Sequence, residues 1–143
     1  MDLNFIIKDE EKKAGFTQEA AKLFAKTVLI IDDSKLNQHL LGTLLQAFGY
    51  KVFYADDGEQ GLAKFEAIRP SITFLDIVMP KKTGLQVLSE IKLRYPKAIV
   101  IMVSSFSSKQ NIHEAKKCGA DWFLKKPFSK DKIQEIVKAI EIK

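Results

Sequence analysis

The sequence has few of the residues that form covalent cross-links or soft metal centres. Cys118 is the only cysteine among 143 residues, which excludes an internal disulfide and a metal site built on several cysteines. The two histidines, His39 and His113, are expected on helices, exposed or half-buried. The longest apolar stretches, Val28–Ile31 and Ala98–Val103, are too short to cross a membrane, and the N-terminus lacks the order of a secretory signal. These absences predict a cytoplasmic protein without membrane insertion.

Long blocks of like charge are also missing. The net charge is +5, and the excess lies in residues 27–143, because the first 26 residues carry five lysines and five acids. The remaining lysines are scattered, which favours solvated helix faces and loops over a nucleic-acid surface. With 46% hydrophobic and 29% charged residues, the composition is ordinary for one globular domain. We therefore expect no direct contact with nucleic acid.

The chain does contain a regular alternation of short apolar runs and amphipathic stretches. Runs rich in β-branched and aromatic residues predict five strands, and apolar residues at helical spacing predict five helices. The predicted strands cover residues 28–31, 51–55, 72–76, 98–103 and 122–125. The predicted helices cover residues 35–48, 59–68, 84–95, 108–118 and 130–142. This order predicts an α/β fold, a doubly wound (βα)5 arrangement with a parallel sheet between two helix layers.

The helical spacing also predicts which apolar side chains face the sheet. This expected inward set includes Leu36, Leu40, Leu44 and Leu45 in the first helix and Leu93 in the third. Ser108 and Ser129 precede the last two helices and are expected to cap them.

Residues 1–26 precede the alternation and are interpreted as an N-terminal extension, with the main domain in residues 27–143. Thr17 is placed to cap a short helix that runs to Lys26, with a narrow apolar stripe. Three alternatives remain for this segment: it packs on the main domain, pairs with a second copy of the chain, or frays.

Polar residues follow four of the five predicted strands. Asp32-Asp33 follows the first strand, Asp76 ends the third, Ser104 follows the fourth, and Lys126 follows the fifth. In open parallel sheets, ligands bind at the carboxyl ends of the strands, so these side chains are expected to converge. Asp32-Asp33 alone is equally compatible with an acidic pair at a helix N-terminus. Its register with Asp76 and Lys126 favours a shared site.

Three carboxylates gathered at one sheet edge repel one another, and the usual remedies are a raised pKa, a metal cation or a lysine. Two unit charges about 4 Å apart interact by about 4 kcal/mol at an effective dielectric near 20. Oxygen ligands without a nearby histidine or cysteine suit Mg²⁺. A carboxylate nucleophile beside Mg²⁺ and the lysine is arranged to form an acyl phosphate.

These residues resemble the receiver domain of two-component response regulators, of the stand-alone chemotaxis-regulator type. The resemblance runs from about Lys26 to the end, with every motif in order. It rests on Leu29-Ile30-Ile31-Asp32-Asp33-Ser34, Leu75-Asp76-Ile77-Val78-Met79-Pro80 with Gly84, Ser104-Ser105, and Gly119-Ala120-Asp121-Trp122-Phe123-Leu124-Lys125-Lys126-Pro127-Phe128. It implies the flavodoxin-like receiver fold, with strand order 2-1-3-4-5.

The resemblance also implies the roles of the site residues. Asp76 is the expected phosphoacceptor, and Asp32, Asp33 and Asp76 are expected to hold Mg²⁺, Asp33 and Asp76 directly, with the main-chain carbonyl of Val78. Lys126 is expected to pair with the phosphoryl group, and Lys126-Pro127 to be a cis peptide bond.

The resemblance further implies a switch. Ser104 is expected to move toward the phosphoryl oxygen, and Phe123 holds the family's aromatic switch position. Together they bias a partner-binding surface made by helix 108–118, strand 122–125 and helix 130–142. The implied partners are a histidine kinase or phosphotransfer protein upstream and a protein target downstream.

The leading interpretation is a stand-alone receiver with no fused output domain, a phosphoacceptor and not an enzyme acting on other substrates. The alternatives are a phosphorelay intermediate that passes phosphate to a phosphotransfer protein and a receiver-like scaffold that is never phosphorylated. An aspartate-dependent phosphatase is disfavoured, because Val78 holds the place of its general acid. Val78 and Phe106 are apolar along the path of an attacking water, so we expect a long-lived phosphoryl group.

Overall fold

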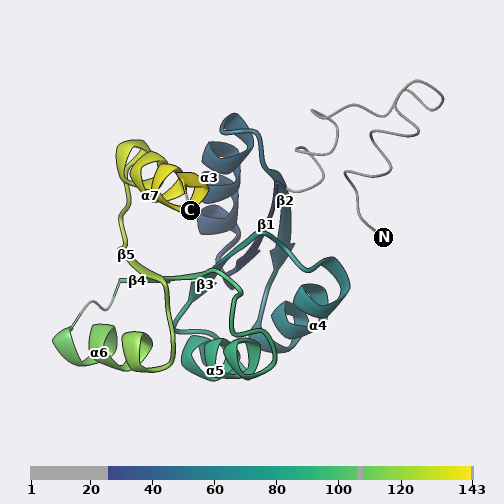
Figure 1. Ribbon diagram of the computed structural model, residues 1–143, viewed down its shortest axis with the longest axis vertical. Helices are drawn as coiled ribbons and strands as arrows, with labels where there is room; N and C mark the ends of the chain where they lie inside the picture. The colour runs from purple at the N-terminus through teal and green to yellow at the C-terminus, as the bar shows by residue number, and fades with distance from the viewer. Residues whose placement is uncertain (1–25, 106–107, 143) are drawn as a thin grey trace.

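The computed structural model describes residues 26–105 and 108–142, and within them strands and helices alternate strictly (Figure 1). The strands are β1 (Thr27–Ile31), β2 (Lys51–Ala55), β3 (Ile72–Asp76), β4 (Val100–Ser104) and β5 (Trp122–Lys125). The helices are α3 (Lys35–Ala47), α4 (Gly58–Ile68), α5 (Gly84–Arg94), α6 (Lys109–Lys117) and α7 (Lys130–Ile142). The N-terminal helix expected before Lys26 lies outside the described residues.

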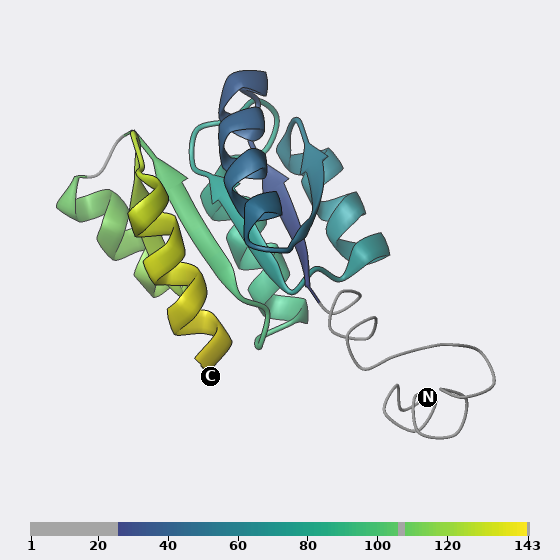
Figure 2. The ribbon, with the colours of Figure 1, turned by 90° about the horizontal axis from the view of Figure 1, so that it is seen from above.

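The strands form one parallel sheet in the order β2-β1-β3-β4-β5, between two helix layers. Helices α3 and α7 lie on one face, and α4, α5 and α6 lie on the other (Figures 1 and 2). This confirms the predicted α/β class and the strand order that the resemblance implied. Among the described residues, no helix is long and apolar enough to cross a membrane.

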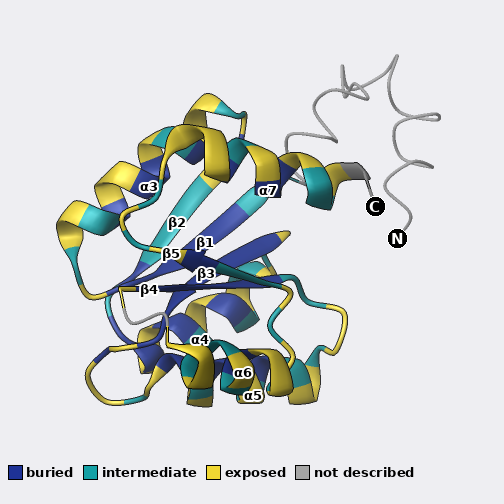
Figure 3. Cartoon of the chain, turned by 90° about the vertical axis from the view of Figure 1, so that its left-hand side faces the viewer, coloured by how far each residue is buried: buried dark blue, intermediate teal, exposed yellow. Residues whose placement is uncertain are grey.

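The core consists of two apolar clusters, one on each face of the sheet. In β1, Val28 and Ile30 pack in the cluster under α3 and α7, and Leu29 and Ile31 pack in the other. Both faces of the central strands are therefore buried, as the dark sheet in Figure 3 shows. Burial on both faces explains why these strands read as continuous apolar runs and lack polar alternation.

Short polar side chains fix the helix starts. The oxygens of Ser108 and Ser129 accept from the backbone N–H groups three residues ahead, at 3.1 Å each, which confirms both as caps. Thr83 caps α5 in a reciprocal arrangement with Gln86. Ser34, directly after the two aspartates, caps α3 by accepting from the Asn37 N–H at 3.2 Å. The acidic loop after β1 therefore ends in a fixed helix start.

Three of the leucines expected to face the sheet do not. Leu36, Leu40 and Leu93 are 66%, 49% and 84% exposed. The residues of α3 that do face the sheet are Gln38, Leu41, Gly42 and Leu45. These lie at spacings of three and four, so the buried stripe is rotated from the predicted one and includes a polar side chain.

Strand β4 begins later than predicted, at Val100 in place of Ala98. The N–H of Ala98 donates to the Tyr95 carbonyl at 3.0 Å, within the turn that follows Pro96. A group used in that turn cannot also join the sheet ladder. At its other end, β4 extends to Ser104, which lies opposite Lys125 of β5.

The start of β1 and the end of α7 lie close together. The Lys26 ammonium is 3.5 Å from Glu141, and the Tyr50 hydroxyl donates to the same carboxylate at 2.9 Å. Burial and the neighbouring carboxylate raise the pKa of Tyr50 above its usual value.

Candidate functional site

Parallel pairing brings the predicted site residues to one edge of the sheet. Asp76 is the last residue of β3 and lies opposite Val103 of β4. Lys126 follows β5 and donates its backbone N–H to the Ser104 carbonyl at 3.0 Å. Asp32 follows β1, and its N–H donates to the Ala55 carbonyl at 3.1 Å. Side chains from four separate strands are therefore held together by backbone hydrogen bonds.

Three carboxylates converge there. One oxygen each from Asp32, Asp33 and Asp76 lies within 4.8 Å of the other two. Asp32 and Asp76 are buried and Asp33 is exposed, so the cluster opens to solvent on one side. An oxygen-only donor set with a solvent-facing side fits Mg²⁺, which keeps several of its waters when bound.

The Lys126 ammonium supplies the positive charge within this cluster. It lies 3.0 Å from Asp32 Oδ2 and 3.5 Å from Asp76 Oδ2, and its side chain is 14% exposed. The Lys126-Pro127 bond is cis, as the resemblance implied.

The Asp76 carboxyl has an altered acidity. Its pKa is raised from 3.8 to about 6, chiefly by burial and also by the neighbouring Asp32 carboxylate, while the Lys126 ammonium opposes this rise. The backbone N–H of Val78 also donates to this carboxylate and favours the charged form. The pKa of Asp76 therefore depends on burial and on its two charged neighbours.

The two predicted switch residues differ in exposure and in their position relative to the carboxylates. Ser104 is 1% exposed at the end of β4. Phe123 lies on β5 opposite Met102 and packs, half-buried, against the cluster under α4, α5 and α6. Phe106, expected beside the water path, lies outside the described residues. The structure thus brings Ser104 to the edge and leaves Phe123 one strand away from the carboxylates.

The loop after Asp76 is shaped by a glycine. A Cβ at Gly84 would lie 2.1 Å from the Asp76 carbonyl oxygen, and the Gly84 N–H donates to the Ile77 carbonyl at 2.8 Å. Only a residue without a side chain permits α5 to start this close to the strand end. The Val78 side chain is 56% exposed at the mouth of the site.

The sequence did not identify Gln38, whose side chain donates a hydrogen bond to the backbone carbonyl of Asp32. Its buried amide donates to the Asp32 carbonyl at 2.6 Å, to Asp56 Oδ1 at 2.8 Å and to the Ala55 carbonyl at 3.3 Å. Gln38 therefore links the loops that follow β1 and β2. Gln38 lies at helical spacing with Leu41 and Leu45, but the spacing alone does not distinguish a buried glutamine from an exposed one.

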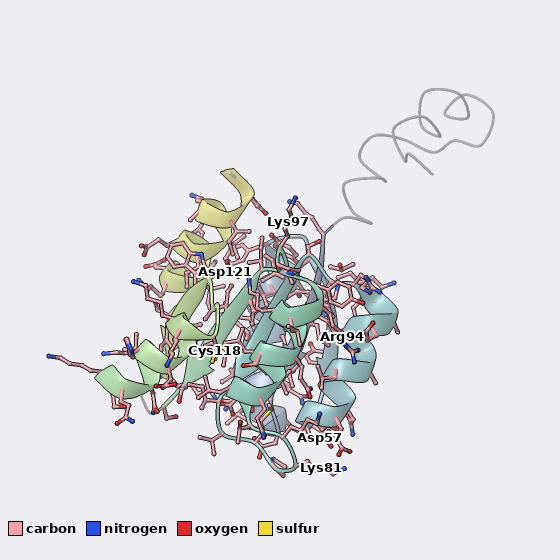
Figure 4. All side chains as sticks on the ribbon, turned by 60° about the horizontal axis from the view of Figure 1, so that its bottom comes forward. Asp57, Lys81, Arg94, Lys97, Cys118 and Asp121 are labelled. Atoms are coloured by element: carbon pink, nitrogen blue, oxygen red, sulfur yellow. The ribbon has the colours of Figure 1, made fainter. Side chains whose placement is uncertain are left out.

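A second missed contact ties the loop after Asp76 to α4. The Lys81 ammonium lies 3.4 Å from Asp57 Oδ2, and Figure 4 shows both residues at the same end of the molecule. Asp57 also caps α4 by accepting from the Gln60 N–H at 2.8 Å. Asp57 is therefore a helix cap that also anchors the neighbouring loop.

Comparison with known proteins places this arrangement in a family. The family model described as the response regulator receiver domain matches residues 28–138. The chain belongs to the response regulator receiver family. The chemotaxis protein CheY of Halobacterium salinarum is 32% identical over 113 residues, covering 79% of this chain and 94% of that protein. Protein PilG of Pseudomonas aeruginosa is 38% identical over 114 residues, covering 78% and 84%.

A solved receiver structure agrees with the fold. CheY in the CheX–CheY–BeF3–Mg²⁺ complex from Borrelia burgdorferi superposes with a TM-score of 0.78 at 32% identity, covering 82% of this chain and 90% of that chain. The predicted resemblance to a chemotaxis-type receiver is therefore confirmed.

Proposed function

We propose that this receiver domain accepts a phosphoryl group on Asp76 from a histidine kinase or a phosphotransfer protein. The observation that carries the proposal is the meeting of the Asp32, Asp33 and Asp76 oxygens within 4.8 Å, with the Lys126 ammonium 3.5 Å from Asp76. A carboxylate alone is a weak nucleophile, and cations around it favour phosphoryl transfer by neutralising charge.

Each residue of the cluster has its own role in the phosphoryl transfer. In the transfer, the bond from phosphorus to the donor nitrogen breaks, a bond from phosphorus to Asp76 Oδ forms, and the donor imidazole keeps the electron pair. Lys126 lowers the pKa of Asp76, which keeps the nucleophile ionised, and then pairs with the phosphoryl oxygens. Mg²⁺ held by Asp32, Asp33, Asp76 and the Val78 carbonyl would supply the remaining positive charge.

Phosphorylation of Asp76 then changes the conformation of a partner-binding surface. The backbone bond from Lys126 to Ser104 couples the ends of β4 and β5, so movement of the Ser104 hydroxyl toward the phosphoryl group shifts both strands. We place the partner surface on α6, β5 and α7, with Phe123 as the aromatic switch. The Borrelia burgdorferi CheY that was solved with CheX supports a protein as the downstream partner.

The rest of the assignment follows from this role. Residues 27–143 form the receiver and residues 1–26 an extension, and the domain signals in the cytoplasm without acting on other substrates. Because the cluster is complete, an unphosphorylated scaffold is the weaker alternative. A phosphorelay intermediate uses the same chemistry and differs only in the fate of the phosphoryl group.

Intact-mass measurement after incubation with acetyl phosphate and Mg²⁺ tests the proposal. One phosphoryl adduct is expected, lost with EDTA and in Asp76→Asn, and retained in Asp131→Asn, which changes an exposed aspartate on α7. Turnover of acetyl phosphate without an adduct would indicate an enzyme, and no reaction would indicate a scaffold. A pull-down with and without beryllofluoride then identifies partners of the activated form.

A further inference from the structure

A pocket of about 440 Å³ opens at the edge of the sheet opposite the carboxylates. It lies where α4 leads into β3 and α5 leads into β4, so it faces the amino ends of those strands. Its apolar wall includes the rings of Phe65 and Tyr95, whose centroids are 5.4 Å apart. Nothing in the phosphoryl-transfer chemistry uses this pocket.

The charged groups that line this pocket are positive. Arg69 places its guanidinium 4.1 Å from the centre of the Tyr95 ring, and Arg94 donates to Glu66 at 2.8 Å. Glu66 also accepts from the Tyr95 hydroxyl at 2.7 Å, which fixes this arrangement. Lys97 forms no ion pair with another described residue. In Figure 4, Lys97 lies at the end of the molecule opposite Asp57 and Lys81.

The chain enters the domain beside this pocket. The Ser71 N–H donates to the Thr27 carbonyl at 2.9 Å, and the Thr27 N–H donates to Ser71 Oγ at 3.4 Å. Pro70, which lines the pocket, immediately precedes Ser71 in the chain. The segment before Thr27 therefore joins the domain beside Ser71, whose neighbour Pro70 forms part of the pocket wall.

The sequence of that segment matches the pocket in chemistry. Residues 3–7 read Leu-Asn-Phe-Ile-Ile, and residues 9–11 read Asp-Glu-Glu. We propose that residues 3–11 dock in this pocket, with the apolar run against Phe65 and Tyr95 and the acidic run against Arg94 and Lys97. A mixed apolar and anionic peptide satisfies both features of the wall, because the rings bury area while the cations pair with carboxylates.

Residues 12–26 tether residues 3–11 to the domain, so even a weak affinity is sufficient to occupy the pocket. Fifteen residues separate the acidic run from Thr27, and a chain of that length spans up to about 50 Å, so it reaches the pocket easily. A short linker holds a ligand at an effective concentration on the order of millimolar. Docking at this edge leaves the carboxylates open and does not depend on phosphorylation.

Paramagnetic broadening tests the proposal on the full chain. A nitroxide is placed on Asn4→Cys in a Cys118→Ser background, and amide signals are compared with the reduced label. We expect selective broadening of residues 69–71 and 95–98. Lys97→Glu, or the triple change of Asp9, Glu10 and Glu11 to amides, should reduce this broadening several-fold. Lys138→Glu, an exposed lysine on α7, should not change it.

Three outcomes would overturn the proposal. Uniform broadening would mean that residues 3–11 have no fixed site, and broadening centred on Leu36 and Leu40 would place them on α3. The third outcome comes from a mixture of two kinds of chain, one isotope-labelled without a nitroxide and one carrying the nitroxide without isotope label. Broadening in this mixture would show that the pocket binds residues 3–11 of a second copy. Well-dispersed amide spectra of every variant confirm that each still folds.

Discussion

The Lys126 ammonium donates a hydrogen bond to Asp32 Oδ2 at 3.0 Å, joining residues 94 positions apart in the chain. Their side chains are only 14% and 6% exposed, so water does little to weaken this pair. The same ammonium lies 3.5 Å from Asp76 and shares its charge between the two carboxylates. The stability of the domain and the chemistry of the site therefore depend on one lysine.

Lys126→Met should destabilise the domain by about 2–3 kcal/mol in EDTA, because two buried carboxylates lose their cation. Urea unfolding with and without Mg²⁺ measures this. Added Mg²⁺ should recover more stability in the variant than in the wild type, since it replaces the missing charge. Lys132→Met removes an exposed pair with Glu135 and should cost under about 0.5 kcal/mol. Equal losses in the two variants would contradict this account.

Asp76→Asn should stabilise the domain by about 1–2 kcal/mol near pH 7 in EDTA. The folded pKa of Asp76, about 6, lies above its ordinary 3.8, so the folded state binds this proton more tightly than the unfolded state. The ionised carboxylate therefore costs stability above pH 6, and this cost disappears as the pH falls toward 4. The advantage of the variant should shrink over that window in urea unfolding curves. An advantage independent of pH would rule out the carboxylate charge as its cause.

Gln38→Met should lower the free energy of unfolding by about 2 kcal/mol, because the Asp32 carbonyl and the Asp56 carboxylate lose their shared donor. The side-chain volume stays nearly constant. Loss of this support should also weaken Mg²⁺ binding by about 10-fold or more, as for other groups that orient ligands. Gln46→Met, at an exposed position of the same helix, is the matched control. Titration calorimetry and urea unfolding separate the two effects, and unchanged Mg²⁺ affinity would limit Gln38 to a structural role.

Gly84→Ala should lower the free energy of unfolding by about 3 kcal/mol, because the new Cβ would lie 2.1 Å from the Asp76 carbonyl oxygen. Helix propensity alone predicts the opposite sign, since alanine favours a helix over glycine. Gly49→Ala is the comparison: its φ is +92°, yet nothing lies within 4 Å of the added carbon, so about 1 kcal/mol is expected. Thermal unfolding should rank the wild type first, Gly49→Ala second and Gly84→Ala last.

The phosphoryl group on Asp76 should persist for minutes or longer, since the exposed Val78 side chain cannot orient an attacking water. Val78→Asn should shorten this lifetime several-fold, and Val78→Ala should not. Phosphate release after removal of acetyl phosphate measures both. Loss within seconds from the wild type would show that other groups position the water.

The sequence was sufficient to predict the sheet and the convergence of the candidate residues at one edge, because strand ends are marked by chemistry. An acid or a lysine at the end of an apolar run marks the place where a buried strand stops, and parallel pairing brings such residues to one edge. Asp32, Asp76 and Lys126 were predicted for that reason. The Lys126-Pro127 cis bond was predicted from the resemblance alone.

Helix orientation and long-range polar contacts were harder to predict. Leu36 and Leu40 lie at helical spacing with Leu44, yet the phase of α3 is set by Gln38, Leu41 and Leu45. Periodicity identifies an apolar stripe but does not show that a buried glutamine belongs to the sheet-facing side. The partners of Gln38 lie on two loops, the farther 18 residues away, so its role depends on tertiary contacts.

The ion pair between Lys26 and Glu141 has a consequence for protein architecture. It shows that the start of β1 and the last turn of α7 lie close together, at the edge of the sheet opposite Asp76. Domains whose ends lie close together tolerate insertion into a loop of another protein, because the host chain leaves and returns at nearly the same point. A receiver inserted in this way would keep the Asp32, Asp33 and Asp76 carboxylates at the far edge of the sheet, away from the host chain.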